Sequence, residues 1–246
     1  MSKESATPVL SARDIHKHFG ALAVLDGVDF SVGADEAVGI VGPNGAGKTT
    51  LLNVLAGSLE PNGGSVWFHD QQINGTSATQ RSRLGIGRAF RIPRPFGDMT
   101  VFENVFVSAS SGGGLRGSRC YERCLEVLDL CGLTPLANRR AESLGLLHRK
   151  RLELARALAT DPVVVLLDEI GGGLTDEEAT ELVLTIKQLR AQGVAIVWIE
   201  HIVHVLLQVV DRLVCMNAGR VIVDGDPDSV LRDEAVIDAY LGSGVV

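Results

Sequence analysis

Long apolar runs are scarce in this 246-residue chain, although 46% of its residues are hydrophobic. No segment approaches the about 18 charge-free apolar residues that a membrane-spanning helix needs. The first ten residues are polar, so we also expect no secretory signal. The richest apolar segments are Val163–Leu167 and Val194–Ile199, which have the length of strands. The sequence therefore predicts a globular protein that does not cross a membrane by itself.

Positive charge is also in short supply, because 23 Lys and Arg face 30 Asp and Glu, a net charge of −7. A general nucleic-acid-binding role is therefore unfavourable, since such proteins carry a basic domain. The charge is unevenly distributed. Residues 85–160 hold 12 basic and 7 acidic side chains, whereas residues 161–246 hold 5 and 15. Phosphates or an acidic partner would favour the middle segment.

Aromatic residues make up only 4% of the chain and there are four cysteines, with no CxxC pair. Cys120 and Cys124 lie one helical turn apart, which suggests either a metal site or two small buried side chains on one helix face. We favour the buried side chains. Glycine, by contrast, is abundant at 28 residues and is clustered, which indicates tight turns close to a ligand.

The chain falls into three regions of different character. Residues up to Asp70 read as a β-rich lobe, and the segment from Gly85 to Thr160 reads as helical. From Val163 onward, strands alternate with helices, which predicts parallel βαβ units. The expected strands are Val28–Val32, Ala37–Val41, Val66–Phe68, Val163–Leu167 and Ala195–Ile199. The expected helices are Lys48–Ala56, Thr100–Ser110, Cys120–Leu130, Leu147–Ala159 and Asp176–Arg190, with a Gly/Ser-rich loop at Ser110–Ser118.

The strongest motif is a phosphate-binding loop, which reads Gly42-Pro43-Asn44-Gly45-Ala46-Gly47-Lys48-Thr49. Two glycines five positions apart, followed by Lys and Ser or Thr, let backbone N–H groups point at phosphate oxygens. The helix that follows adds its positive N-terminal end, Lys48 neutralises phosphate charge, and Thr49 can bind Mg²⁺. A strand precedes the loop and a helix follows it, as this motif requires.

Two further groups follow apolar strands. Asp168 and Glu169 end the run that begins at Val163, which would place Asp168 beside a metal ion and Glu169 where water is activated. Two carboxylates after a strand are weak evidence for a catalytic site by themselves, but together with a phosphate loop they are strong evidence. His201 follows the strand Ala195–Ile199, from which a histidine can reach a terminal phosphate. The alternative is that His201 is an ordinary surface residue.

The sequence resembles the ATP-binding subunits of ABC transporters over nearly its whole length, and most of all the ATPases of branched-chain amino acid importers. The stretches that carry the resemblance are "HFGALAVLDGVDFSV", "GPNGAGKTTLLNVLAG", "MTVFENV", "RLELARALATDP", "LLDE", "IEH" and "VIDAYLG". It implies an α/β fold, with a P-loop NTPase core built on a parallel sheet, an N-terminal antiparallel β subdomain and a helical insertion. The whole chain, 1–246, would be one ABC ATPase domain. Residues 1–90 and 160–246 would form its core and about 91–159 its helical subdomain.

The resemblance also implies roles for individual residues. Phe19 would stack on adenine, although a simple core position is its alternative. The segment from Gly42 to Thr50 would wrap the triphosphate of ATP, and Thr49 and Asp168 would hold Mg²⁺. Catalysis would fall to the following three residues: Lys48 as the phosphate-neutralising cation, Glu169 as the group that polarises water, and His201 as the sensor of the γ-phosphate.

Two departures from the family pattern stand out. Arg91 occupies the position of a glutamine that reaches the metal and the attacking water, and a guanidinium group, which has only donors, cannot bind Mg²⁺. The family's Leu-Ser-Gly-Gly-Gln signature corresponds here to Leu144–His148, which lacks the serine and the second glycine. Since each signature completes the opposite subunit's site in a dimer, the site that receives this one should be weakened.

The resemblance implies a peripheral protein on the cytoplasmic face of the inner membrane. Its partners would be a second ABC ATPase, two transmembrane permease subunits and, indirectly, a periplasmic solute-binding protein. The altered signature favours a heterodimer over a homodimer, and Arg91–Met99 is the expected docking surface. One alternative is an ATP-responsive partner with weak hydrolysis of its own. Another is a soluble ABC protein that acts on DNA or ribosomes, which the negative net charge disfavours.

Overall fold

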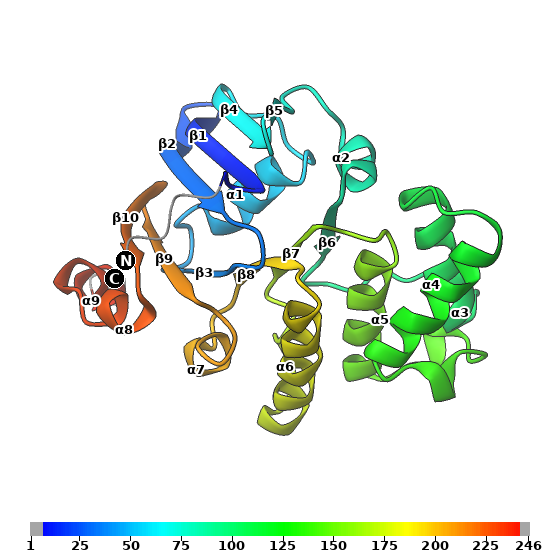
Figure 1. Ribbon diagram of the computed structural model, residues 1–246. Coiled ribbons are helices and arrows are strands. Elements are labelled where there is room, and N and C mark those ends of the chain that lie inside the picture. The colour runs from blue at the N-terminus through cyan, green and yellow to red at the C-terminus, as the bar shows by residue number, and fades with distance from the viewer. Residues whose placement is uncertain (1–6, 242–246) are drawn as a thin grey trace.

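A computed structural model describes residues 7–241 of the chain (Figure 1). Its larger sheet has six strands in the order β10-β9-β3-β8-β7-β6, in which all neighbours are parallel except β10 and β9. Their bounds are β3 Ala37–Val41, β6 Ile86–Ala89, β7 Val164–Asp168, β8 Ala195–Ile199, β9 Arg212–Asn217 and β10 Arg220–Gly225. The fold is therefore α/β with a mostly parallel sheet, as the sequence predicts.

A second, antiparallel sheet lies over α1 (Lys48–Leu55), on the upper side of the molecule in Figure 1. Its strand order is β2-β1-β4-β5. The bounds are β1 Leu10–Phe19, β2 Leu22–Val32, β4 Gly63–Phe68 and β5 Gln71–Gln72. The β-rich region up to Asp70 thus divides between two sheets, because β3 leaves the antiparallel set and pairs with β8 and β9 in the parallel sheet. The predicted N-terminal antiparallel β subdomain is thus confirmed, and the strand before the phosphate loop belongs to the parallel sheet.

Each central strand of the parallel sheet is buried on both faces, because its side chains alternate between two hydrophobic cores. In β7, Val164 and Leu166 pack on the side of α1 and the antiparallel sheet, while Val165 and Leu167 pack on the helical side. The same alternation runs through β3 and β8. A strand with both faces covered must be apolar throughout, which explains the unbroken runs in the sequence.

The helical insertion leaves the parallel sheet after β6 and returns to it at β7, its neighbour (Figure 1). It contains α3 (Val101–Val107), a π-helical turn (Ser108–Gly112), α4 (Gly117–Leu130), two short 3₁₀ turns (Thr134–Leu136, Ala141–Ser143) and α5 (Leu146–Leu158). The remaining helices are α2 (Ala78–Leu84), α6 (Asp176–Ala191), α7 (Val203–Leu206), α8 (Pro227–Leu231) and α9 (Glu234–Leu241). Figure 1 shows α3–α5 at the opposite side of the molecule from α8 and α9.

Local signals mark several helix ends. Thr175 and Glu178 form the predicted capping box at the start of α6, and Thr100 and Glu103 form another at α3. The predicted Gly/Ser-rich loop at Ser110–Ser118 was partly wrong, since α3 runs on into the π-helical turn and α4 begins at Gly117. Cys120 and Cys124 are buried, in agreement with the favoured interpretation.

Candidate functional site

The predicted phosphate loop connects β3 to α1, and its glycines adopt conformations that other residues rarely reach. Gly42, Gly45 and Gly47 have φ values of 141°, 82° and 99°. A Cβ atom at Gly42 would lie 2.0 Å from the carbonyl oxygen of Met216, and one at Gly47 would lie 2.7 Å from that of Val24. The loop therefore favours glycine at all three positions for its turns, and at Gly42 and Gly47 also for its close packing.

Lys48 begins α1 and turns its ammonium group back over the loop. Nζ donates hydrogen bonds to the carbonyl oxygens of Gly42, at 2.6 Å, and Pro43, at 2.9 Å. Burial lowers the pKa of Lys48, while the nearby Glu169 and Asp168 carboxylates oppose that shift. The Lys48 ammonium group is thus held against two backbone carbonyl oxygens of the loop, with the Glu169 and Asp168 carboxylates nearby.

The ends of β3 and β7 bring Thr49 and Asp168 together across the sheet. The Thr49 hydroxyl donates a hydrogen bond to Oδ1 of Asp168 over 3.3 Å. Asp168 is buried, and its Oδ2 lies 3.1 Å from Nη2 of Arg88 on the neighbouring strand β6. Burial lowers the pKa of Arg88, and the ion pair with Asp168 opposes that shift. A hydroxyl and a carboxylate oxygen side by side form a donor set suited to a hard divalent cation.

Glu169 lies one residue beyond β7, where its backbone takes a left-handed turn with φ 47°. Its side chain is buried, and one carboxylate oxygen, Oε1, lies 2.8 Å from Nε2 of His201. The other, Oε2, lies 2.9 Å from Nη1 of Arg91. The predicted pair of Glu169 and His201 is therefore in direct contact, and Arg91 joins it.

Glu200, between β8 and His201, fixes the turn that carries the histidine. Its carboxylate accepts hydrogen bonds from the backbone N–H groups of Gly171 and His201, both at 3.0 Å. Burial raises the pKa of Glu200, while those two N–H groups lower it again. The side chain joins the segments after β7 and β8 and so sets the positions of both.

A hollow of about 260 Å³ lies against the phosphate loop and Glu169, while Asp168 and His201 do not line it. In the described part of the chain its lining consists of Val24, the loop and helix start Asn44–Thr50, Arg91 and Glu169. Phe19 is not in that set. It lies at the turn between β1 and β2, is 51% exposed, and has the Lys17 ammonium 5.2 Å from its ring centre. The alternative of a core position for Phe19 was wrong.

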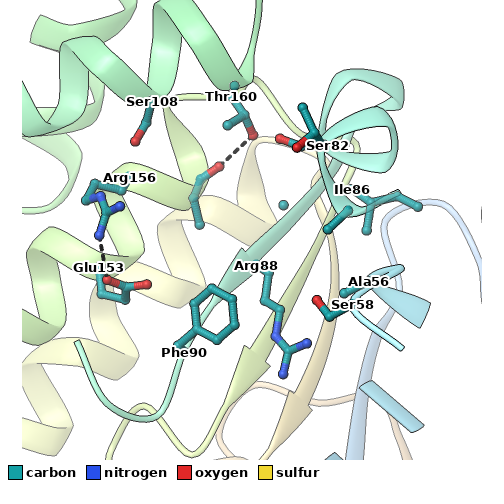
Figure 2. A pocket seen from close by; sticks show the side chains of 15 residues that line it. Ala56, Ser58, Ser82, Ile86, Arg88, Phe90, Ser108, Glu153, Arg156 and Thr160 are labelled. Atoms are coloured by element: carbon teal, nitrogen blue, oxygen red, sulfur yellow. Dashed lines mark hydrogen bonds and ion pairs between the residues drawn. The ribbon is translucent and has the colours of Figure 1, made fainter. Parts of the chain in front are cut away.

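A separate cavity of about 400 Å³ lies beside the site, between α2, β6 and the helical insertion (Figure 2). Figure 2 shows the ion pair of Glu153 with Arg156 at the left, and Phe90 and Arg88 along the lower edge. Burial raises the pKa of Glu153, and Arg156 lowers it again. The cavity thus has charged walls and shares Arg88 with the Asp168 ion pair.

Three functional candidates escaped the sequence interpretation. Arg88 and Glu200 contact the site directly, and the Tyr240 hydroxyl on α9 accepts a hydrogen bond of 2.8 Å from the Gly42 N–H group. Burial raises the pKa of Tyr240, against the effect of that hydrogen bond. Glu200 adjoins the predicted His201, a signal that was available. No local pattern marks Arg88 or Tyr240, whose partners are distant in sequence.

The altered signature segment forms the beginning of α5. Gly145 is the residue before the first turn, with φ −69° and ψ 171°, and it provides no side-chain hydrogen bond to the helix. Leu146 follows it and is 46% exposed. The N–H groups of the first turn therefore open onto the surface without a capping hydroxyl.

Comparisons with known proteins agree with this geometry. A family model described as "ABC transporter" matches residues 25–171, and one described as "Branched-chain amino acid ATP-binding cassette transporter" matches residues 220–246. Of the described residues, Gly42, Lys48, Asp168 and Glu169 fall within the first match, and Tyr240 within the second.

Curated relatives match over almost the whole chain. The high-affinity branched-chain amino acid transport ATP-binding protein LivG of Escherichia coli K12 is 34% identical, over 96% of this chain and 98% of its own length. The corresponding protein BraF of Pseudomonas aeruginosa is 33% identical with the same coverage. Among solved structures, a nucleotide-free ATP-binding cassette from an ABC transporter has a TM-score of 0.85 at 30% identity, over 95% of this chain and 98% of its own. The ADP conformation of MJ1267, a cassette of an ABC transporter, also gives 0.85 at 30% identity, over 96% and 99%.

Proposed function

Because the chain belongs to the ABC transporter family, in its branched-chain amino acid transport type, we propose that it hydrolyses ATP to power import of branched-chain amino acids or a related small solute. One observation carries the hydrolytic part of this proposal. The phosphate loop, the Thr49–Asp168 pair and the Glu169–His201 pair converge at the carboxyl ends of neighbouring parallel strands.

The loop is suited to a triphosphate. Gly42 and Gly47 leave no room for side chains against Met216 and Val24, and Lys48 is among the residues that line the hollow beside the loop. We assign phosphate binding to Gly42, Pro43, Asn44, Gly45, Ala46, Gly47, Lys48, Thr49 and Thr50. Phe19 remains the proposed adenine platform, and its exposed ring at the β1–β2 turn supports that role.

The donor set also suits Mg²⁺, since Thr49 and Asp168 supply oxygen atoms 3.3 Å apart. Bound there, Mg²⁺ would neutralise charge on the β- and γ-phosphates. Arg88 already compensates part of the Asp168 charge from the opposite side. This ion pair also holds the buried carboxylate in place through its second oxygen.

The protein's own residues account for the chemistry as follows. Lys48 neutralises charge on the terminal phosphates, and Glu169 orients a water molecule and accepts its proton as the oxygen attacks. His201 holds the Glu169 carboxylate through its 2.8 Å contact and can donate to a phosphate oxygen. Glu169 has a left-handed backbone with φ 47°, while its N–H group still donates a hydrogen bond to the carbonyl oxygen of Ile199 at the end of β8.

The proposed setting is a peripheral subunit on the cytoplasmic face of the inner membrane, in a complex with a second ABC ATPase and two permease subunits. A periplasmic solute-binding protein would act on it indirectly, and nucleic acid is not a proposed partner. Two observations support this setting. Among residues 7–241, no helix is long and apolar enough to cross a bilayer. The proposed docking segment, Arg91–Met99, exposes Ile92, Phe96 and Met99 among basic side chains.

The decisive experiment compares turnover of Glu169→Gln with that of the wild type, in the presence of the partner ATPase. We expect turnover to fall by about 10²–10⁴-fold, the range for loss of a general base, while ATP still binds. The matched control is Glu177→Gln, an exposed carboxylate on the first turn of α6, which should leave turnover unchanged. Equal rates for wild type and Glu169→Gln would exclude catalysis at this site.

A second candidate, an ATP-responsive subunit with little hydrolysis of its own, has one specific observation in its favour. The Arg91–Glu169 ion pair engages the proposed base, and the altered signature would weaken the opposite site. The same experiment separates the two candidates, because this one predicts that Glu169→Gln changes neither turnover nor ATP binding.

A further inference from the structure

Arg91 lies two residues beyond β6, and its contact with Glu169 is unusual in its chemistry. Its Nη1 is 2.9 Å from Oε2 of a glutamate side chain that is 7% exposed, whereas the arginine side chain is 63% exposed. His201 meets the other oxygen of that carboxylate at 2.8 Å. Both oxygens of the proposed base are therefore engaged by nitrogen donors.

This arrangement conflicts with the role of a base. To orient a water molecule and accept its proton, a carboxylate needs an oxygen free to accept a hydrogen bond from that water. His201 comes from a short turn that Glu200 fixes through two backbone hydrogen bonds. Arg91 sits in the stretch between β6 and α3, with its head group largely in solvent. Of the two partners, Arg91 is the one free to leave.

The place to which Arg91 can move lies in the same hollow. Arg91 lines it together with the phosphate loop and Glu169. A terminal phosphate bound by that loop carries more negative charge than one carboxylate and matches the planar fork of a guanidinium group. The same arginine thus faces two competing anions, of which one belongs to the protein and the other to ATP.

We propose that Arg91 is a terminal-phosphate switch: it holds Glu169 while ATP is absent and transfers to the γ-phosphate when ATP binds, which frees Oε2 for water. The inference rests on the proposed ATPase function and deepens it. ADP lacks the third phosphate and leaves the Arg91–Glu169 ion pair in place. The protein therefore discriminates ATP from ADP through Arg91, in addition to what the phosphate loop contributes.

The test is a binding measurement, since selectivity between nucleotides separates this role from a merely structural one. Affinities for ATP and ADP, each with Mg²⁺, are measured by calorimetry on the wild type, Arg91→Gln and Arg91→Lys. In Arg91→Gln we expect the preference for ATP over ADP to fall about tenfold, the effect of one charge-assisted hydrogen bond. Arg91→Lys should recover part of it, because lysine keeps the charge without the fork.

The matched control is Arg94→Gln, three residues further along the same exposed segment. Arg94 takes part in none of the ion pairs found among the described residues, so its removal should leave the preference unchanged. Unchanged melting temperatures would establish that the variants fold. If Arg91→Gln lost affinity for ATP and ADP equally, or kept both affinities unchanged, the switch would be refuted. The proposed ATPase function would not be affected by that result. A wild type that binds no ATP would instead overturn the proposed function, and the switch with it.

Discussion

The buried ammonium group of Lys48 carries the first prediction at the scale of single residues. Replacement by methionine keeps the length of the side chain but removes the cation that faces the hollow. We expect Lys48→Met to weaken ATP binding by about 10–100-fold, because a hydrogen bond to a charged group contributes roughly 1.5–3 kcal/mol. Equilibrium titration with ATP measures the change.

Lys187→Met on α6 provides the comparison, because Lys187 is exposed on the surface of that helix. Its affinity for ATP should equal that of the wild type. If Lys48→Met also kept wild-type affinity, the loop would not be the phosphate site.

Individual site residues differed in how far the sequence could identify them. The loop residues 42–49 form one contiguous motif, and Asp168, Glu169 and His201 each follow an apolar strand, so local patterns identified them as candidates. Arg88 contacts Asp168 across 80 positions, and Tyr240 contacts Gly42 across 198. Such contacts depend on strand register and helix placement, which no window of sequence contains.

Helix α9 is tied to the phosphate loop through one hydroxyl group, which gives a prediction at the scale of elements. Tyr240→Phe removes the acceptor of the buried Gly42 N–H group and keeps the ring. The net loss of about 1 kcal/mol that one hydrogen bond represents should lower the melting temperature by about 2–4 °C. Calorimetric melting curves provide the measurement.

The only other tyrosine is a suitable control. Tyr121 on α4 is 56% exposed and contacts Phe102 and Phe106 through its ring. Tyr121→Phe keeps those contacts, so its melting temperature should match that of the wild type. A Tyr240→Phe protein that melts together with Tyr121→Phe would show that the α9 contact contributes nothing to stability.

The start of α5 gives a second prediction for an element. Gly145 has the dihedral angles of an N-cap, and a Cβ placed there meets nothing within 4 Å. Gly145→Ser would therefore supply the missing capping hydroxyl without strain and add a few tenths of a kcal/mol, about 1 °C in melting temperature. It also restores the serine of the signature, so ATP turnover of the dimer should rise.

Gly145→Ala separates these two effects, since alanine is a poorer N-cap than glycine and has no hydroxyl. The expected order of melting temperatures is Ser above Gly above Ala. A reversed order would show that the segment before α5 does not act as a cap.

Secondary structure was predictable wherever packing demands a repeating pattern. The runs in β3, β7 and β8 are apolar because both faces of these strands are covered, and the capping box of α6 lies within four residues. The order of the strands was not predictable. β3 joins the parallel sheet rather than the antiparallel one because of pairing with β8 and β9, more than 150 residues away.

For the whole molecule, the buried Glu153 makes stability depend on pH. Burial raises its pKa above the ordinary 4.5, so its contribution is fully present below about pH 4.5 and is lost as the pH rises through the raised value. Compared with Glu153→Gln, the wild type should therefore lose stability as the pH rises above 4.5. Melting temperatures of both proteins across this range test the expectation.

Compared with Glu103→Gln, the wild type should lose stability as the pH falls, which is the opposite of the comparison with Glu153→Gln. Hydrogen bonds from Thr100 lower the pKa of Glu103, so its contribution is present above the ordinary pKa and is lost as the pH falls. If the melting temperatures of both variants changed with pH in the same way as that of the wild type, neither carboxylate would contribute to the pH dependence of stability.

Assembly is the other property of the whole molecule that can be tested. Because the altered signature would serve the opposite subunit, two copies of this chain would form two weakened sites. We expect Glu169→Gln with ATP and Mg²⁺ to keep a mass near 26.1 kDa in light scattering and to dimerise when the partner ATPase is added. A dimer of this chain alone would contradict the preference for a heterodimer.

The left-handed backbone at Glu169 lowers the stability of the fold at a residue that is proposed to act in ATP turnover. A glutamate with φ 47° stores on the order of 1 kcal/mol that a glycine would release. Selection for stability alone would therefore replace this glutamate, and the proposed base would be lost with it. Glutamate is therefore kept at this position only where its proposed role as a base is needed. Relatives that have lost that role should carry glycine or asparagine there.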